Sequence, residues 1–147
     1  MQIRSAAEAD WPQIVALLHA SGLPVAGLYD HLPTTLVATA GADLLGCAAL
    51  ELYDQAALLR SVAVTATQRG YGVGQALTAA ALGLARQHGI QQVYLLTETA
   101  PDFFVRFGFQ AGNRTTVPPS VRTSVEWTEA CPASALVMVA DIAPIPA

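Results

Sequence analysis

The stretch TQRGYGVGQAL, from Thr67 to Leu77, sets three glycines in alternation directly ahead of an alanine- and leucine-rich run. Glycine tolerates positive φ and lets a ligand approach main-chain atoms closely. A helix that begins here would add free N–H donors and a partial positive charge, and both favour an anion such as phosphate. The stretch therefore predicts a loop that presents backbone amides to an anionic ligand.

Two familiar nucleotide-binding loops differ from this stretch. A P-loop needs a lysine, but all seven basic residues of the chain are arginines, which also excludes Schiff-base chemistry. A dinucleotide-binding loop needs a further glycine where Gln75 stands, and the next strand, which ends near Leu96, is not closed by an acidic residue. The pattern that fits is R-x-x-G-x-G, from Arg69 to Gly74.

The segments on either side of the loop alternate between strand-like and helix-like patterns. Strands are predicted over residues 2–6, 34–40, 44–53, 57–64, 92–97 and 134–142. Helices are predicted over 11–19, 75–88 and 101–108, the first with Asp10 and Gln13 as a capping box. Structured loops are predicted over 21–33, with one helical turn, and over 115–132.

The order of these elements predicts the topology. Residues 34–64 form an antiparallel meander, and a second turn centred on Gln55 and Ala56 would place Glu51 opposite Arg60 as a cross-strand ion pair. The strand, glycine loop, helix and strand that follow make a βαβ unit, which gives parallel neighbours and a ligand crevice at their carboxyl ends. We therefore expect a single α/β domain with a mixed sheet over residues 1–147.

Composition limits the partners. A hydrophobic share of 53% with 12% charged residues suits one well-filled domain, and a net charge of −4 argues against a nucleic-acid partner. The longest low-polarity run is too short to cross a membrane, and the N-terminus has no apolar signal core. Cys47 and Cys131 are expected to be reduced thiols, so the protein is expected in the cytoplasm.

The loop and its context resemble motif A of the GCN5-related N-acetyltransferases (GNAT). A meander precedes R-x-x-G-x-G, an FGF element follows it by roughly 35 residues, and the overall length is similar. The resemblance implies a single GNAT-like domain whose loop amides hold the pyrophosphate of acetyl-CoA, with no metal. Residues 22–32, 57–64, 94–104 and 131–135 further resemble the acetyltransferases of bacterial arsenic-resistance operons. That likeness implies detoxification of an arsenical amino acid or its phosphorus analogue.

The resemblance assigns the coenzyme site residue by residue. Main-chain groups of the strand before the loop would pair with the pantetheine arm, and one amide, that of Val62, would polarise the thioester carbonyl. The residues implied in coenzyme binding are Val62, Ala63, Val64, Arg69, Gly70, Tyr71, Gly72, Val73, Gly74, Gln75 and Phe104. Arg69 could instead be a solvated loop charge.

The chemistry needs a group that takes a proton from the acceptor ammonium. Glu51 and Glu98 are the candidates, because each lies near a strand end that faces the expected crevice. Glu51 could instead be a plain partner of Arg60, and Glu98 an exposed charge. Relatives often carry a tyrosine as general acid where this chain has Phe104, and an asparagine where it has Thr97, so Phe104 would be an apolar wall.

Acidic groups on an acceptor would call for arginine forks. Arg60, Arg114 and Arg122 are candidates, although each could be a surface charge, and Asp30 and His31 could line the opposite wall. The expected partner is a small-molecule amine, and homodimers are common in the superfamily. Two alternatives stay open, namely a protein or peptide N-acetyltransferase and a non-catalytic acyl-CoA sensor.

Overall fold

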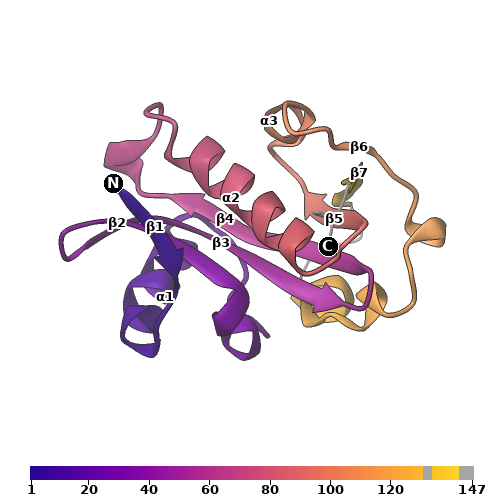
Figure 1. Ribbon diagram of the computed structural model, residues 1–147, viewed down its shortest axis with the longest axis horizontal. Coiled ribbons are helices and arrows are strands. Elements are labelled where there is room, and N and C mark those ends of the chain that lie inside the picture. Colours follow the sequence, from indigo (N-terminus) through magenta and orange to yellow (C-terminus); the bar gives the residue numbers. More distant parts are fainter. Residues whose placement is uncertain (131–133, 143–147) are drawn as a thin grey trace.

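A seven-stranded mixed sheet organises the chain, in the order β1-β2-β3-β4-β5-β7-β6. The computed structural model describes residues 1–130 and 134–142 (Figure 1). Its strands are β1 Gln2–Ser5, β2 Thr35–Ala40, β3 Asp43–Tyr53, β4 Ala56–Val64, β5 Gln92–Thr97, β6 Gln110–Ala111 and β7 Leu136–Asp141. The predicted mixed α/β class is confirmed.

Three α-helices and several short turns of helix accompany the sheet within the described ranges. The α-helices are α1 Trp11–Ala20, α2 Val73–Gln87 and α3 Pro101–Val105. The short 3-10 turns are η1 Glu8–Asp10, η2 Tyr29–Thr34, η3 Ala66–Gln68, η4 Arg114–Thr116 and η5 Val121–Thr123, and η6 Glu126–Ala130 is a π-helix. The predicted strands and helices are confirmed apart from shifts at their ends, and the loop at 115–132 contains η5 and η6.

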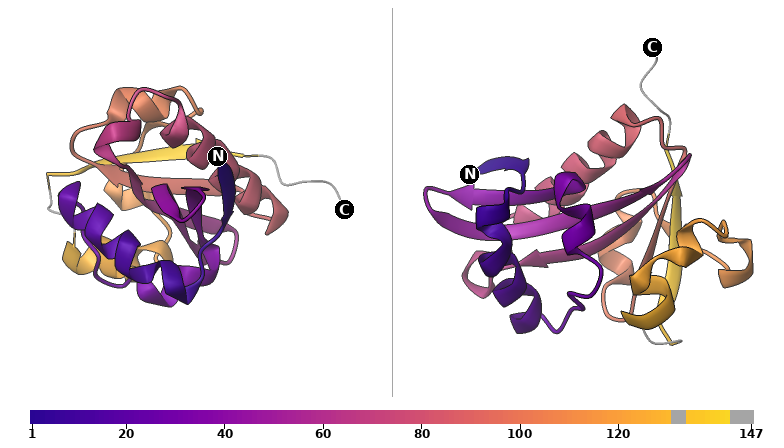
Figure 2. Two further views of the ribbon diagram at one scale, coloured as in Figure 1. Left: turned by 90° about the vertical axis from the view of Figure 1, so that its left-hand side faces the viewer. Right: turned by 90° about the horizontal axis from the view of Figure 1, so that it is seen from below.

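Helices cover both faces of the sheet (Figures 1 and 2). Alternate strand residues face opposite sides, so Leu50 packs in a cluster with Leu77 and Leu82 of α2, while its neighbour Ala49 packs with Leu18 of α1. On the side of α1, the segment that carries η5 covers the far half of the sheet through Val121 and its neighbours. The result is a three-layer arrangement with the sheet in the middle.

The parallel ladder between β4 and β5 is short. It joins Ala56–Leu58 to Gln92–Tyr94 and goes no further, whereas β5 stays paired with β7 through Thr97. The βαβ unit with parallel neighbours is therefore confirmed. Beyond Leu58 and Tyr94 the two strands diverge, and no strand among the described residues pairs with the rest of the β4 edge that faces β5.

A β-bulge bends β4 at the same level. Ser61 and Val62 together face the single residue Ala48 of β3, because the register shifts between Cys47 and Ala49. Ser61 has a φ of 58°, which is uncommon for a residue other than glycine. An inserted residue of this kind increases the local bend and twist of a strand, so the bulge turns β4 away from β5.

The predicted register between β3 and β4 was wrong. Tyr53 pairs with Ala56, so the turn is centred on Asp54 and Gln55, and Asp54 adopts a φ of 59° to make it. Such positive φ values are what a two-residue hairpin turn requires. Glu51 consequently lies opposite Leu58 rather than Arg60. The ion pair between Glu51 and Arg60 forms nonetheless, as a diagonal contact.

The predicted capping box at the start of α1 was also wrong. The carboxylate of Asp10 accepts hydrogen bonds from Arg4 at 2.7 and 2.9 Å and from the amide of Ala7, so it caps η1 and not α1. Gln13 instead accepts a hydrogen bond from the amide of Leu44 at 3.2 Å. The helix begins at Trp11 as expected, because Pro12 fits its first turn.

Cys47 is a free thiol in the core strand β3, and burial raises its pKa to about 12, which makes it unreactive at neutral pH. Cys131, the other expected thiol, and residues 143–147 lie outside the described residues. None of the helices within the described ranges has the length and apolar character that a bilayer crossing demands.

Candidate functional site

A cavity of about 630 Å³ opens where β4 and β5 diverge. Its walls come from the segment after α1, from the distal halves of β4 and β5, from α3, and from the segment that leads to β7. The lining residues are Ser21–Pro24, Leu59–Val64, Arg69, Gly74, Leu95–Ala100, Phe103, Phe104, Glu126 and Ala135. The crevice predicted at the carboxyl ends of the parallel strands is therefore present.

The glycine loop stands beside this cavity at the start of α2. Gly70 and Gly72 have φ values of 85° and 82°, and a Cβ at either position would point into open space. Gly72 is the N-cap of α2, and no side chain caps the helix there. The first-turn amides of α2 thus lie next to bare backbone, which suits a phosphate group.

Only part of the predicted coenzyme loop lines the cavity itself. Arg69 and Gly74 do, and the Nε of Arg69 donates a hydrogen bond to the carbonyl of Val64 at 3.3 Å. The rest of the loop lies outside the lining, with Tyr71 80% exposed. The loop residues outside the lining are Gly70, Tyr71, Gly72, Val73 and Gln75. The loop therefore forms the rim of the site.

The wall below the rim combines a free strand edge with an aromatic cluster. Val62, Ala63 and Val64 line the cavity from the part of β4 that has no ladder to β5. Phe104 is buried and contacts Phe103 and Phe109 edge-on, with ring centroids 5.0 and 5.8 Å apart. Main-chain donors and acceptors on one side thus face an apolar wall on the other.

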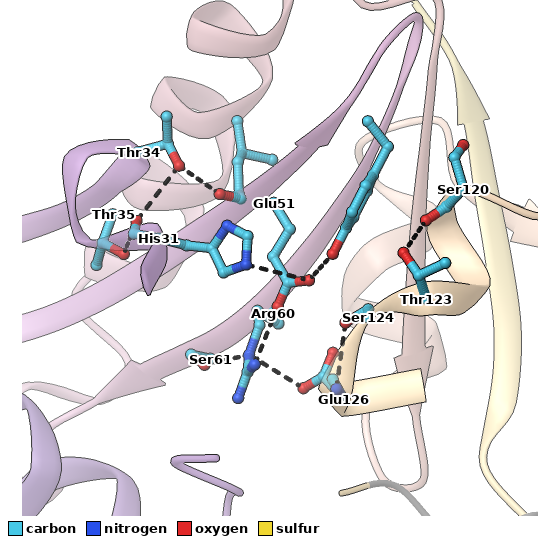
Figure 3. A network of polar contacts seen from close by, with 12 residues as sticks. His31, Thr34, Thr35, Glu51, Arg60, Ser61, Ser120, Thr123, Ser124 and Glu126 are labelled. Atoms are coloured by element: carbon cyan, nitrogen blue, oxygen red, sulfur yellow. Dashed lines mark hydrogen bonds and ion pairs between the residues drawn. The ribbon is translucent and has the colours of Figure 1, made fainter. Parts of the chain in front are cut away.

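Arg60 lies at the floor of the cavity and is fully buried. Its Nη1 donates to Glu51 at 3.0 Å, and its Nη2 donates to the carbonyl of Pro24 at 3.2 Å. Its Nε donates to the hydroxyl of Ser61 at 3.2 Å and lies 3.6 Å from the carboxylate of Glu126 (Figure 3). The guanidinium is thus held by the protein itself between two carboxylates.

Glu51 is 1% exposed and lies behind Arg60, outside the cavity lining. Besides Arg60, it accepts a hydrogen bond from the Tyr53 hydroxyl, and the Nε2 of His31 lies 3.6 Å away (Figure 3). Burial by itself would raise the pKa of Glu51, but hydrogen bonds from Ser124, Tyr53 and Arg60 outweigh it and hold the pKa below its usual value. Glu51 is therefore a fixed anion.

Glu126, in η6, is also buried but differs from Glu51 in its position, its hydrogen bonds and the direction of its pKa shift. It lines the cavity, is 4% exposed, and its Oε2 has no hydrogen-bond partner among the described residues. Burial raises its pKa to about 7, with Arg60 lowering the pKa and Glu51 raising it further. Sequence reasoning missed Glu126, because nothing in the polar, proline-marked stretch around it marks a π-helix or its inward face.

The other predicted site residues are dispersed. Glu98 lines the cavity with an exposed side chain. Asp30 and Arg122 are exposed and lie outside the lining, and His31 contacts Glu51 rather than the cavity. Arg114 donates to the carbonyl of Ala135 at 2.7 Å and lies over the ring of Trp127. Of the residues predicted to bind the acceptor, Arg60 lines the cavity, whereas Asp30, His31, Arg114 and Arg122 lie outside its lining.

Within the described part of the chain, no three His, Cys, Asp or Glu side chains are grouped as a metal site would need. Thr97, which stands at the expected asparagine position, accepts a hydrogen bond from the amide of Ala100 at 3.1 Å. This bond stabilises the turn from β5 into α3, so the Thr97 hydroxyl is occupied by a main-chain hydrogen bond.

Two curated proteins of similar sequence are acetyltransferases. An uncharacterised N-acetyltransferase of Chlorobaculum tepidum is 30% identical over 87 residues, which cover 58% of this chain and 56% of that protein. The amino-acid acetyltransferase of Mycobacterium tuberculosis is 40% identical over 68 residues, which cover 45% of this chain and 38% of that protein. The chain thus matches little more than half the length of the first relative and less of the second.

Solved structures of the same fold cover nearly all of the chain. Rv2747 from Mycobacterium tuberculosis, in complex with CoA and NLQ, matches 97% of this chain and 99% of its own with a TM-score of 0.82 and 23% identity. N-acetylglutamate synthase from Neisseria gonorrhoeae, complexed with coenzyme A and N-acetyl-glutamate, matches 95% of this chain and 34% of its own, with a TM-score of 0.82 and 24% identity. Residues 32–111, more than half of the sequence, match the acetyltransferase (GNAT) domain. The chain belongs to the GNAT acetyltransferase family.

Proposed function

We propose that this protein is an acetyl-CoA-dependent N-acetyltransferase that acts on the amine of a small amino-acid-like acceptor. The observation that carries the proposal is the cavity between the diverging ends of β4 and β5, with the glycine loop at its rim. Membership of the GNAT family supports the reaction. The complexes of two structural neighbours with coenzyme A support the donor.

The residues fit a coenzyme of this shape. The bare backbone at Gly70 and Gly72 and the uncapped start of α2 would receive the pyrophosphate, with Arg69 beside them. The free edge of β4 from Val62 to Val64 would pair with the amide groups of the pantetheine arm. The amide of Val62 would then stabilise negative charge on the thioester oxygen, an effect typically worth about 3 kcal/mol.

The departing thiolate has no phenol beside it at position 104. Phe104 would serve as an apolar wall against the acyl end of the arm. A thiolate is a tolerable leaving group, because ordinary thiols ionise at about 8.5. The proposed transfer therefore uses no phenol at position 104, and the proton on the acceptor amine is the one that the protein must manage.

An amino-acid-like acceptor is favoured by the relatives and by the shape of the site. One relative is an amino-acid acetyltransferase, and one neighbour is complexed with N-acetyl-glutamate. Segments before β2 and before β7 both contribute to the cavity wall, which suits a small acceptor better than an extended peptide. Within this class, the likeness to arsenic-resistance enzymes singles out arsenical and phosphinate amino acids as candidates.

A steady-state acceptor screen tests the proposal. Thiol release from acetyl-CoA is followed with ordinary amino acids, glutamate among them, with arsenical and phosphinate amino acids, and with peptides. We expect release with one amino-acid class and none with peptides. Turnover on peptides alone would show a protein acetyltransferase, and tight coenzyme binding without turnover on any amine would show a sensor. Homodimerisation is a separate prediction, and light scattering tests it by measuring the mass of the protein in solution.

A further inference from the structure

Two buried carboxylates flank the guanidinium of Arg60, and their surroundings differ. Glu51, on the far side from the cavity, has partners on both of its oxygens. Glu126, on the cavity side, touches Arg60 through Oε1 at 3.6 Å and leaves Oε2 buried without a partner among the described residues. Buried polar atoms of this kind are rare in native proteins, because each costs the desolvation of the group.

We propose that Glu126 binds the acceptor ammonium and takes its proton, while Glu51 serves as the fixed counter-charge that positions Arg60. The inference rests on the proposed function and names the residue that manages the acceptor proton. It replaces Glu51 and Glu98 as the candidate base, since Glu51 lies outside the cavity and Glu98 is exposed to solvent.

The charge of the cluster supports this assignment. Arg60 and Glu51 neutralise each other at 3.0 Å, so an ionised Glu126 leaves the cavity floor with one negative charge. An ammonium group that donates to Oε2 would neutralise this charge and satisfy the unpaired oxygen at once. The Tyr53 hydroxyl, the Ser124 hydroxyl and the imidazole of His31 also face the cluster and act on Glu51, whereas the Ser61 hydroxyl and the Pro24 carbonyl accept from Arg60.

The titration of the two carboxylates agrees with these roles. The pKa of Glu51 is held below its usual value, so it stays ionised, whereas burial raises the pKa of Glu126 to about 7. A base works best when its pKa lies near the working pH. Environments that push the pKa values of two neighbouring carboxylates apart are a recognised sign of separate acid–base roles.

In the proposed step, the acceptor ammonium gives up two protons. One N–H bond of the acceptor ammonium breaks, and its proton moves to Oε2 of Glu126. The nitrogen lone pair forms a C–N bond to the acetyl carbonyl carbon, and the C–S bond breaks. The second amine proton goes to the departing sulfur, so the products are the N-acetylated acceptor and the CoA thiol. Glu126 then returns its proton to solvent.

The test compares Glu126→Gln with the wild type over a pH series of kcat/KM. For the wild type we expect a rise through about pH 7, as Glu126 ionises. For the variant we expect kcat/KM to fall by roughly 100-fold or more. Its kcat/KM should rise only at the pH where the acceptor ammonium loses a proton in solution. Glu8→Gln, the same change at an exposed site, is the matched control and should follow the wild type.

Two further measurements make the result decisive. Calorimetry with acetyl-CoA checks that the Gln variant still binds the donor. Carbon NMR of the Glu126 carboxyl, assigned by through-bond correlation to the Glu126 backbone, should give a pKa of about 7 that falls in Glu51→Gln, because the repelling charge of Glu51 is removed. Should the Gln variant fail to fold, the NMR titration of the wild type decides.

The outcomes separate the inference from the proposed function. An active wild type with an equally active Glu126→Gln variant, or a Glu126 carboxyl that titrates at the ordinary value of about 4.3, overturns the inference and leaves the function intact. A wild type that neither binds acetyl-CoA nor releases thiol with any amine overturns both.

Discussion

At the scale of single residues, the polar floor of the cavity shows how burial assigns different tasks to similar side chains. Glu51 and Glu126 are both almost fully buried, and both approach Arg60. Hydrogen bonds keep Glu51 ionised, whereas Glu126 lacks them on one oxygen. The difference comes from the neighbours of each carboxylate and not from the residue type.

We expect Glu51→Gln to lower the free energy of unfolding by about 3 kcal/mol, because the change breaks the buried 3.0 Å ion pair and leaves the Arg60 charge only its 3.6 Å contact with Glu126. Asp10→Asn is the comparison, since its partner Arg4 has a side chain that is 39% exposed. That change should cost about 1 kcal/mol or less. Urea denaturation measures both values, and equal costs would contradict the argument from burial.

At the scale of elements, glycines act in two ways around α2. Gly46 lets β3 approach the helix, since a Cβ there would lie 2.8 Å from the carbonyl of Ala63 and 2.9 Å from Leu77. Gly72 and Gly89 flank the helix at its two ends with φ values of 82° and 74°, and both face open space. The two terminal glycines have the same backbone requirement, but only Gly72 adjoins the proposed coenzyme site.

Gly89 is a matched control for a prediction about Gly72. Gly72→Ala and Gly89→Ala should each cost about 1–2 kcal/mol of unfolding free energy, because each forces a left-handed backbone on a residue with a Cβ. Only Gly72→Ala should also weaken acetyl-CoA binding in calorimetry, because its methyl group would enter the space of the pyrophosphate. Equal coenzyme affinity in the two variants would remove the loop from the site.

At the scale of the whole molecule, the divergence of β4 from β5 creates the cavity and also a cost in stability. The segments that close it bring Glu126 into a buried position where its pKa is raised to about 7 from an ordinary 4.5. A carboxyl with a raised pKa in the folded protein binds its proton more tightly there than in the unfolded chain. Its contribution to stability is therefore complete below about pH 4.5 and is lost as the pH rises through 7.

Glu126→Gln removes this titration while it keeps the shape of the side chain. We expect the unfolding free energy of the variant, relative to the wild type, to increase as the pH rises from about 4.5 to 7. Urea denaturation across this range measures it. The exposed replacement Glu8→Gln should show no comparable increase, and a pH-independent difference for Glu126→Gln would mean that Glu126 is not a buried titrating group.

The sequence by itself determined the order and type of the elements, the mixed sheet, the crevice after the parallel strands, and the glycine loop at the start of α2. These follow from local patterns, namely hydrophobic periodicity, glycine positions and turn residues, which act within a few residues along the chain. The contact between Glu51 and Arg60 was also predictable, since a shift of one residue in the turn still leaves them as diagonal neighbours.

Only the tertiary structure decided which charged side chains meet in the cavity. The bulge at Ser61 changes the register midway along β4, and the π-helix at Glu126–Ala130 turns one particular carboxylate inward, from a segment about 66 residues away from Arg60 along the chain. Neither feature has a local sequence signal. Arg114 and Arg122 matched the expected chemistry as well as Arg60 did. Their segment packs against β5 and β7, and their side chains lie outside the lining of the cavity.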